Sequence, residues 1–244
     1  MKRSERHHLK ENELVALVDR TRDVVVARRR ELMLAVTAIL VLAVAAAGYF
    51  SWRARAESRA SALLADAMTT LEAEVVTPAP PAAGQPAPKP PAGTYPSEQT
   101  KFQAAVPKLT AVYTQYPSTD AGRAARYFAA NALATLGRRA EAQARYQELV
   151  DQGGIYAEMA RLGLAGLLSG SGDHDRAIAI YKELSADPDA SLPLDGVLIQ
   201  LGRVYAKAGR KSEAQQTYSR IVQEFPESLY AADARRELEA LKKS

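Results

Sequence analysis

Few residues in this sequence are suited to chemistry, and the histidines show this first. The chain has three histidines and no cysteine; His7 and His8 stand together near the N-terminus and His174 lies far from them. Thiolate nucleophiles, zinc-thiolate sites, disulfides and a lipidated-cysteine anchor all require cysteine, so the composition excludes them. One histidine in the large C-terminal part is too few for a histidine–carboxylate metal cluster. We therefore expect no metal and no cofactor.

His174 is the centre of the only arrangement that resembles a nucleophilic site. It lies in Gly-Ser-Gly-Asp-His-Asp, residues 170–175, which would supply a serine, a histidine and an aspartate to a hydrolase. The same residues read as the start of a helix, with Asp173 or Asp175 as the N-cap acceptor. The Ser-Gly-Ser-Gly stretch lacks the Lys-Ser/Thr ending of a phosphate-binding loop. We predict a helix start, no nucleotide and no enzyme.

One apolar segment is long enough to cross a membrane. Residues 32–52 contain no charge, and at about 1.5 Å per residue a helix of that length crosses a hydrocarbon core of about 30 Å. Three arginines precede it, and Tyr49, Phe50 and Trp52 lie at its far end. The positive-inside rule then predicts a single-pass protein of the bacterial inner membrane, with its N-terminus in the cytoplasm and the rest in the periplasm.

A cleaved secretory signal is the alternative, because residues 45–47 are alanines of the kind that a signal peptidase accepts. The apolar segment and the charged residues 1–31 before it are both longer than a signal peptide requires, which favours a retained anchor. Residues 9–26 mix leucine and valine with charged residues. They suit either an amphipathic helix at the inner leaflet or a solvated tail that only sets topology.

The charge distribution argues against nucleic acid as a partner. The formal net charge is +4, but residues 1–30 hold nine Lys/Arg against five Asp/Glu, and residues 53–244 hold twenty-three against twenty-two. A nucleic-acid surface needs clustered basic groups to displace counterions from phosphates. The large C-terminal part has no such excess.

Two segments follow the apolar stretch. Residues 53–76 carry apolar residues at helical spacing without glycine or proline, which predicts that one helix continues out of the bilayer. Residues 77–97 hold eight of the thirteen prolines, which predicts an extended polyproline-like loop. A spacer is the expected role, and a docking site for a proline-recognising domain is the alternative.

Residues 98–244 are predicted to form one all-helical domain. Helical segments recur between Gly, Pro and Asp breaks, and a small residue followed four positions later by a larger one recurs with them. The pairs are Ala105/Leu109, Ala142/Tyr146, Ala177/Tyr181 and Ala214/Tyr218. Successive alanines are 37, 35 and 37 residues apart, close to the 34-residue period of tetratricopeptide repeats.

The clearest repeat covers residues 195–226. Gly202 and Ala214 stand where two helices of a hairpin cross closely, Tyr218 fills the gap toward the next hairpin, and Pro226 stops the second helix. Two weaker copies precede it, and a degenerate one pairs the helix before the proline-rich segment with residues 99–116. A closing helix is predicted over residues 233–241. The fold class is thus an all-α tetratricopeptide-type hairpin array preceded by one transmembrane helix.

Binding by such an array uses its concave face, which is lined by residues of the first helix of each hairpin. Offsets from the aligned alanines place these residues on that face: Tyr127, Asn131, Met159, Leu162, Ile199, Arg203 and Lys207. The apolar members suit a hydrophobic segment or an amphipathic helix, and the basic ones an acidic rim. A helix-packing role is the alternative for each.

The order of these parts resembles the tetratricopeptide family that includes the ancillary subunit of the bacterial Sec translocon (YfgM-like). The shared features are Leu-Lys-Glu-Asn-Glu at residues 9–13, Arg-Arg-Arg-Glu at 28–31, one apolar span, and Tyr-Pro or Phe-Pro-x-Ser at helix junctions. The resemblance implies a periplasmic, non-enzymatic scaffold whose partners are translocon components, membrane-bound folding factors and emerging polypeptides. The proline-rich segment departs from that family. A scaffold that organises cell-wall synthesis or outer-membrane assembly is the alternative function.

Overall fold

The computed structural model describes residues 28–77, 91–188 and 190–243. Most of the N-terminal segment predicted for residues 1–31, and the central part of the proline-rich segment, therefore lie outside the described residues. The chain divides into two compact units, residues 1–55 and 56–244. Each is described by itself below.

The apolar segment belongs to a single long helix, α2, which covers Arg29–Leu71. Its most apolar window of 18 residues has a mean hydropathy of 2.4 and is 0% buried, so α2 is long and apolar enough to cross a membrane. The exposed side chains there include Leu34, Leu42, Val44 and Trp52. Exposing such a continuous apolar surface to water is unfavourable in free energy, whereas the hydrocarbon core of a bilayer accommodates it.

Helix α2 ends earlier than residue 76, the boundary that its apolar spacing suggested. Beyond Leu71 the chain is extended: the Val76 amide donates to the Tyr95 carbonyl at 2.9 Å, and the Tyr95 amide donates to the Glu74 carbonyl at 3.0 Å. In the sequence, Pro78 disfavours helical backbone at Thr77, the residue before it. These two bonds satisfy backbone groups that the helix no longer pairs.

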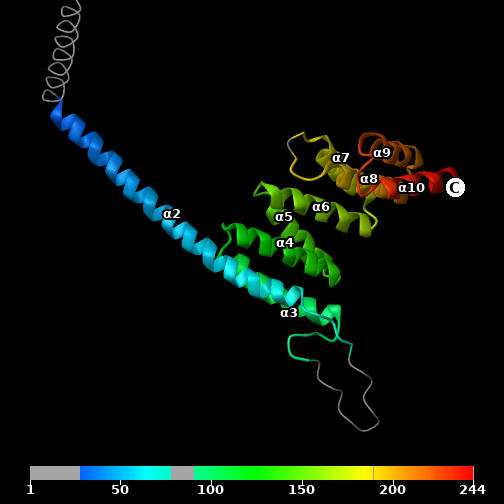
Figure 1. Cartoon of the computed structure of the whole chain (residues 1–244), viewed down its shortest axis with the longest axis horizontal. Helices are drawn as coiled ribbons and strands as arrows, with labels where there is room; N and C mark the ends of the chain where they lie inside the picture. Colours follow the sequence, from blue (N-terminus) through cyan, green and yellow to red (C-terminus); the bar gives the residue numbers. More distant parts are fainter. Residues whose placement is uncertain (1–27, 78–90, 189, 244) are drawn as a thin grey trace, which may run out of the picture. The chain divides into compact units, whose positions relative to one another are not determined.

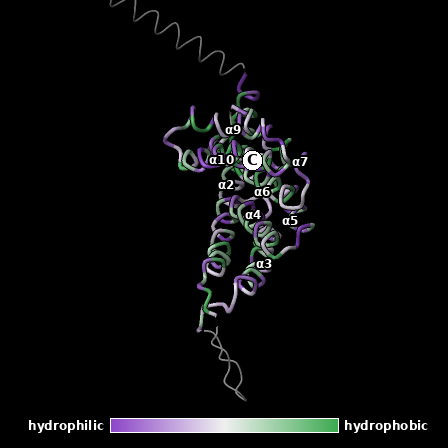
Figure 2. The backbone as a smooth tube through the Cα atoms, turned by 90° about the vertical axis from the view of Figure 1, so that its right-hand side faces the viewer, coloured by the Kyte–Doolittle hydropathy of each residue, from purple (hydrophilic) through white to green (hydrophobic). Residues whose placement is uncertain are grey.

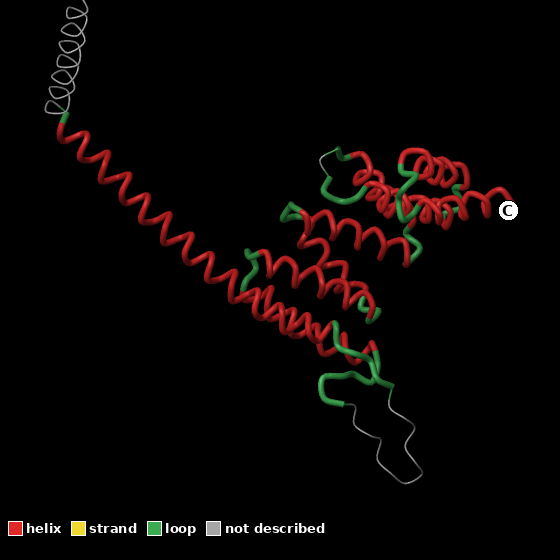
Figure 3. Tube along the Cα trace, in the orientation of Figure 1, coloured by secondary structure: helices red, strands yellow, loops and turns green. Residues whose placement is uncertain are grey.

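The second unit is built from the C-terminal part of α2 and eight further helices. They are α3 Glu98–Gln115, α4 Asp120–Thr135, α5 Arg139–Val150, α6 Ile155–Gly170, α7 His174–Ala186, α8 Leu194–Lys207, α9 Lys211–Glu224 and α10 Ala231–Lys243. From α3 onward each helix packs on its neighbours in sequence (Figure 1). Apart from an isolated bridge between Val75 and Tyr95, the described residues contain no strand (Figure 3). This confirms the predicted all-helical array, in which α10 is the last described helix.

The hairpin turns follow from glycines at fixed places in the repeat. Gly137, Gly172 and Gly209 lie just after α4, α6 and α8 with φ of 74°, 87° and 74°. Only glycine adopts this left-handed backbone without steric cost. The residue after each glycine donates its amide hydrogen back into the helix that has just ended. The chain can therefore reverse within a few residues and start the second helix of the hairpin.

The packing confirms the alignment of the repeats. The four small residues of the predicted pairs are 0% exposed, and their larger partners are at most 3% exposed: Ala105/Leu109, Ala142/Tyr146, Ala177/Tyr181 and Ala214/Tyr218. The helices of the array carry both hydrophobic and hydrophilic stretches, as expected of helices that pack on one side (Figure 2). The first helices of successive hairpins also touch, α4 with α6 and α6 with α8.

The first hairpin pairs α2 with α3, as predicted for the degenerate repeat. Ala60 and Ala67 of α2 share a buried cluster with Ala105 and Leu109 of α3. Glu57 adds a polar link, because its two carboxylate oxygens accept hydrogen bonds from the backbone amides of Asp120 and Ala121, both at 2.9 Å. These amides are the unpaired donors at the start of α4. Glu57 therefore ties the C-terminal part of α2 to the second hairpin.

Candidate functional site

The loops between hairpins are held by acidic residues near the start of the first helices. Glu158 of α6 accepts from the Ser191 amide at 2.8 Å and from the Ser191 hydroxyl at 3.3 Å. Asp195 of α8 accepts from the Ser228 hydroxyl at 2.5 Å. The two pairs occupy equivalent places one repeat apart. Each fixes the position of the residue that follows the serine, which is Leu192 in one loop and Leu229 in the next.

An apolar pocket of about 340 Å³ lies between these two loops. It is lined by residues of α6, α8 and the loops before α8 and α10: Leu162, Leu192, Pro193, Asp195, Gly196, Val197, Gln200, Leu229 and Tyr230. Gly196 lies beside the Tyr230 ring, where a β-carbon would be in ordinary van der Waals contact with the ring at 3.5 Å. Leu229 is 93% exposed at the rim. The pocket therefore presents an open apolar surface with few polar groups.

The structure brings one predicted site residue into this pocket, Leu162, whose side chain is half-buried. Met159, one turn earlier on α6, is also half-buried, and Lys207 is exposed in the last turn of α8. These three positions remain available to a partner.

Ile199 does not fit the prediction of a binding residue, because it is 0% exposed. The closing helix reaches this part of α8: Arg203, one turn beyond Ile199, lies 3.2 Å from Asp233 of α10. Burial of Ile199 in the core cluster removes it from the binding face. Arg203 is already paired with a carboxylate of the same chain, so it is not a free cation for an acidic rim.

Tyr127 and Asn131 of α4 are engaged in packing. The Tyr146 hydroxyl donates to the Asn131 side-chain oxygen. The Tyr127 ring lies 6.3 Å from that of Tyr146 and 6.4 Å from that of Tyr156, measured between centroids. Burial, and secondarily Tyr127, raises the pKa of Tyr146 above its ordinary range, which keeps the hydroxyl protonated as a donor. These contacts join α4, α5 and α6.

Sequence reasoning missed most of the pocket because its rim is formed by loops. The signal was present: Ser191-Leu192 and Ser228-Leu229 are the same dipeptide 37 residues apart, one repeat period. A leucine at the same place in two polar loops is a candidate contact residue. Offsets counted along the first helix of each hairpin did not include these loop leucines.

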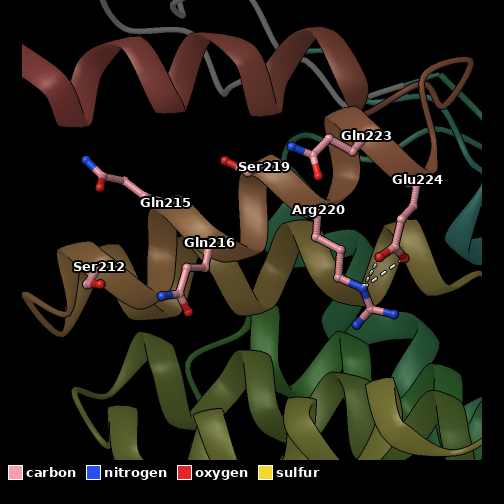
Figure 4. A pocket seen from close by; sticks show the side chains of 7 residues that line it. All are labelled: Ser212, Gln215, Gln216, Ser219, Arg220, Gln223 and Glu224. Carbon is pink, nitrogen blue, oxygen red and sulfur yellow. Dashed lines mark hydrogen bonds and ion pairs between the residues drawn. The ribbon is translucent and has the colours of Figure 1, made fainter.

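A second hollow, of about 440 Å³, lies on α9 and differs in chemistry. Its lining comes from one helix: Ser212, Gln215, Gln216, Ser219, Arg220, Gln223 and Glu224 (Figure 4). The Arg220 Nε donates to both Glu224 carboxylate oxygens, at 3.0 and 2.9 Å, so these charges are already paired. The side chains that line this face are all polar or charged. It is the larger hollow, but the pocket at Leu162 is the stronger candidate because an apolar lining with few polar groups is typical of ligand sites.

The residues around His174 serve the helix start. Asp173 is the N-cap of α7 and accepts from the Arg176 amide at 3.4 Å, as predicted. Asp175 pairs with Arg210 of the next hairpin at 2.5 Å. Both carboxylates are thus held by arginines and backbone. Neither orients the imidazole, whose Nδ1 is buried without a partner in the described structure.

Part of the array is similar to known proteins. The tetratricopeptide repeat family model matches residues 168–238, which run from the end of α6 into α10. A solved tetratricopeptide repeat protein from Parabacteroides merdae ATCC 43184 is 18% identical with a TM-score of 0.48, and the alignment covers 60% of this chain. The chain spans 56% of that protein's length. A search of curated proteins found no match. Residues 168–238 thus match the tetratricopeptide repeat family model, and they lie within a longer all-helical array of hairpins.

Proposed function

We propose that this chain is a non-enzymatic, membrane-anchored periplasmic scaffold that binds polypeptides, ancillary to the Sec translocon and the periplasmic chaperone network. The apolar pocket beside Leu162 carries the proposal. Tetratricopeptide arrays present curved helical surfaces that hold other proteins. The apolar part of α2 provides the anchor, and the resemblance in the order of parts suggests the translocon as the setting.

The chemistry of the pocket favours an apolar polypeptide segment as ligand. Its volume of about 340 Å³ suits one or two side chains. Leu229 leaves nearly all of its surface in water, and burying a leucine contributes about 1.5 to 3 kcal/mol. A segment that places an apolar side chain in the pocket covers Leu229 at the same time. Binding therefore gains from both surfaces.

Crosslinking in cells tests the pocket and its partners. A photoreactive residue at position 229 is expected to capture translocon components or polypeptides in transit, and Leu162→Glu is expected to lower that capture about tenfold. The physical reason is that a carboxylate in the apolar pocket must lose its hydration when a ligand enters. Mass spectrometry of the crosslinked species identifies the partner.

The matched control places the same photoreactive residue at Gln216, on the polar face of α9. Equal capture from both positions would show that the pocket has no special role. Capture of cell-wall enzymes without any translocon component would support the envelope-organising alternative and exclude the Sec setting.

Topology gives a second prediction. Protease added to spheroplasts is expected to digest residues 56–244, because the basic N-terminal segment keeps residues 1–31 in the cytoplasm. The intact protein should fractionate with membranes at its full mass of 26.4 kDa. Protection of the helical array would reverse the topology. A soluble product that lacks the apolar segment would indicate a cleaved signal.

A further inference from the structure

Three tyrosines occupy equivalent places in the second helices of the hairpins. Tyr146, Tyr181 and Tyr218 are 35 and 37 residues apart and at most 3% exposed. The residues opposite them on the first helices have the same spacing: Asn131, Gly166 and Arg203. The array thus contains three versions of one arrangement that differ in the first-helix residue.

The three hydroxyl groups have different surroundings. The Tyr146 hydroxyl donates to the amide oxygen of Asn131. The Tyr218 hydroxyl has no partner among the described residues and is sealed from solvent. The Tyr181 hydroxyl also makes no hydrogen bond within the described structure, but its oxygen is not completely shielded from solvent. Of the three hydroxyls, that of Tyr181 is therefore the one that is unpaired within the described residues and not fully shielded from solvent.

Gly166 explains this access. It is exposed on α6, and a β-carbon built on it would lie 3.8 Å from the Tyr181 hydroxyl oxygen. The equivalent Asn131 fills this place in the earlier hairpin with its own side chain. Burial raises the pKa of Tyr181 to about 12, so the hydroxyl stays protonated at neutral pH and can donate. The missing side chain leaves a gap with a hydrogen-bond donor at its base.

We propose that this gap, between Gly166 and the Tyr181 hydroxyl, binds a backbone amide carbonyl of the polypeptide held in the adjoining pocket. The amide oxygen of Asn131 shows which acceptor fits the same place in the earlier hairpin. Leu162 lies one helical turn, about 5.4 Å, before Gly166 on the same face of α6. One extended segment therefore reaches both, with a side chain beside Leu162 and a carbonyl at Tyr181. This site rests on the proposed function, since it requires a polypeptide ligand.

Removal of the hydroxyl tests the site. The full chain in mild detergent is titrated with reduced, carboxymethylated α-lactalbumin, an unfolded polypeptide, and binding is measured by fluorescence anisotropy. Tyr181→Phe is expected to weaken binding about three- to tenfold, the range of one hydrogen bond. Its thermal unfolding should stay unchanged, because the hydroxyl forms no bond within the described chain.

Two variants separate a binding role from a structural one. Gly166→Asn is expected to weaken binding as much as Tyr181→Phe, because the new amide oxygen would accept from Tyr181 as Asn131 accepts from Tyr146. Tyr146→Phe removes the same group where it is already paired, so it should lower the unfolding temperature and leave binding unchanged. Equal binding by the original chain and by Tyr181→Phe would overturn this site alone. If the original chain does not bind the probe, the proposed function fails, and this site with it.

Discussion

Replacing Gly202 with alanine is expected to destabilise the end of the array by about 2 kcal/mol, although alanine is the better helix former. A β-carbon at this position would lie 2.4 Å from the Tyr218 ring, closer than any van der Waals contact. The ring is fully buried and cannot swing away. The α8–α9 hairpin must therefore open to accept one methyl group.

Hydrogen exchange of the full chain in detergent measures this effect. Amides of α8, α9 and α10 should lose protection, while those of α3 and α4 keep theirs, because each repeat contacts only its neighbours. Gly196→Ala, on the same helix, is the matched control. Its β-carbon would meet Tyr230 at an ordinary 3.5 Å, so this variant should be neutral or gain up to about 1 kcal/mol. Equal effects of the two substitutions would contradict close helix crossing at Gly202.

Leu109→Ala should cost about 3 kcal/mol of stability, because it leaves a cavity in the first hairpin. Leu109 is 0% exposed and belongs to the buried cluster that includes Ala60 and Ala67 of α2. Small alanines on α2 cannot expand to fill the space, and helix packing allows little relaxation. Urea unfolding of the full chain in detergent, followed by circular dichroism, should show the loss as a lower midpoint.

The neighbouring residue provides the comparison. Lys108 lies 2.8 Å from Asp66 of α2, but the two side chains are 42% and 64% exposed. An exposed ion pair contributes little, so Lys108→Ala should change stability by less than about 0.5 kcal/mol. A small effect of Leu109→Ala would mean that α2 does not complete the first hairpin.

The local repeat was readable from the sequence because its constraints are local. Gly202, Ala214 and Tyr218 are required wherever two helices cross closely, and the glycine after each first helix is required by the left-handed turn. Periodicity therefore predicted the hairpins, the register and the closing helix. The membrane-length segment followed from composition alone.

The binding surface depended on contacts that periodicity does not encode. Leu162 and Ile199 have the same offset within their repeats, yet Leu162 lines an open pocket and Ile199 is 0% exposed. Ile199 belongs to the buried core cluster, whereas Leu162 is only partly buried against that cluster. Exposure is a property of the whole array, so sequence offsets predict a face but not what covers it.

The gap at Gly166 shows the same contrast between what the sequence predicts and what the tertiary structure decides. The sequence determined which residues recur at each position of the repeat, because helix crossing and chain reversal restrict side-chain size and backbone conformation locally. Only the tertiary structure decided that the Tyr181 hydroxyl faces Gly166, which has no side chain to cover it. The same holds for the two loop leucines, which line one pocket. Such sites arise between helices and loops that are distant in the chain, where the relative position of elements, and not their composition, sets the chemistry.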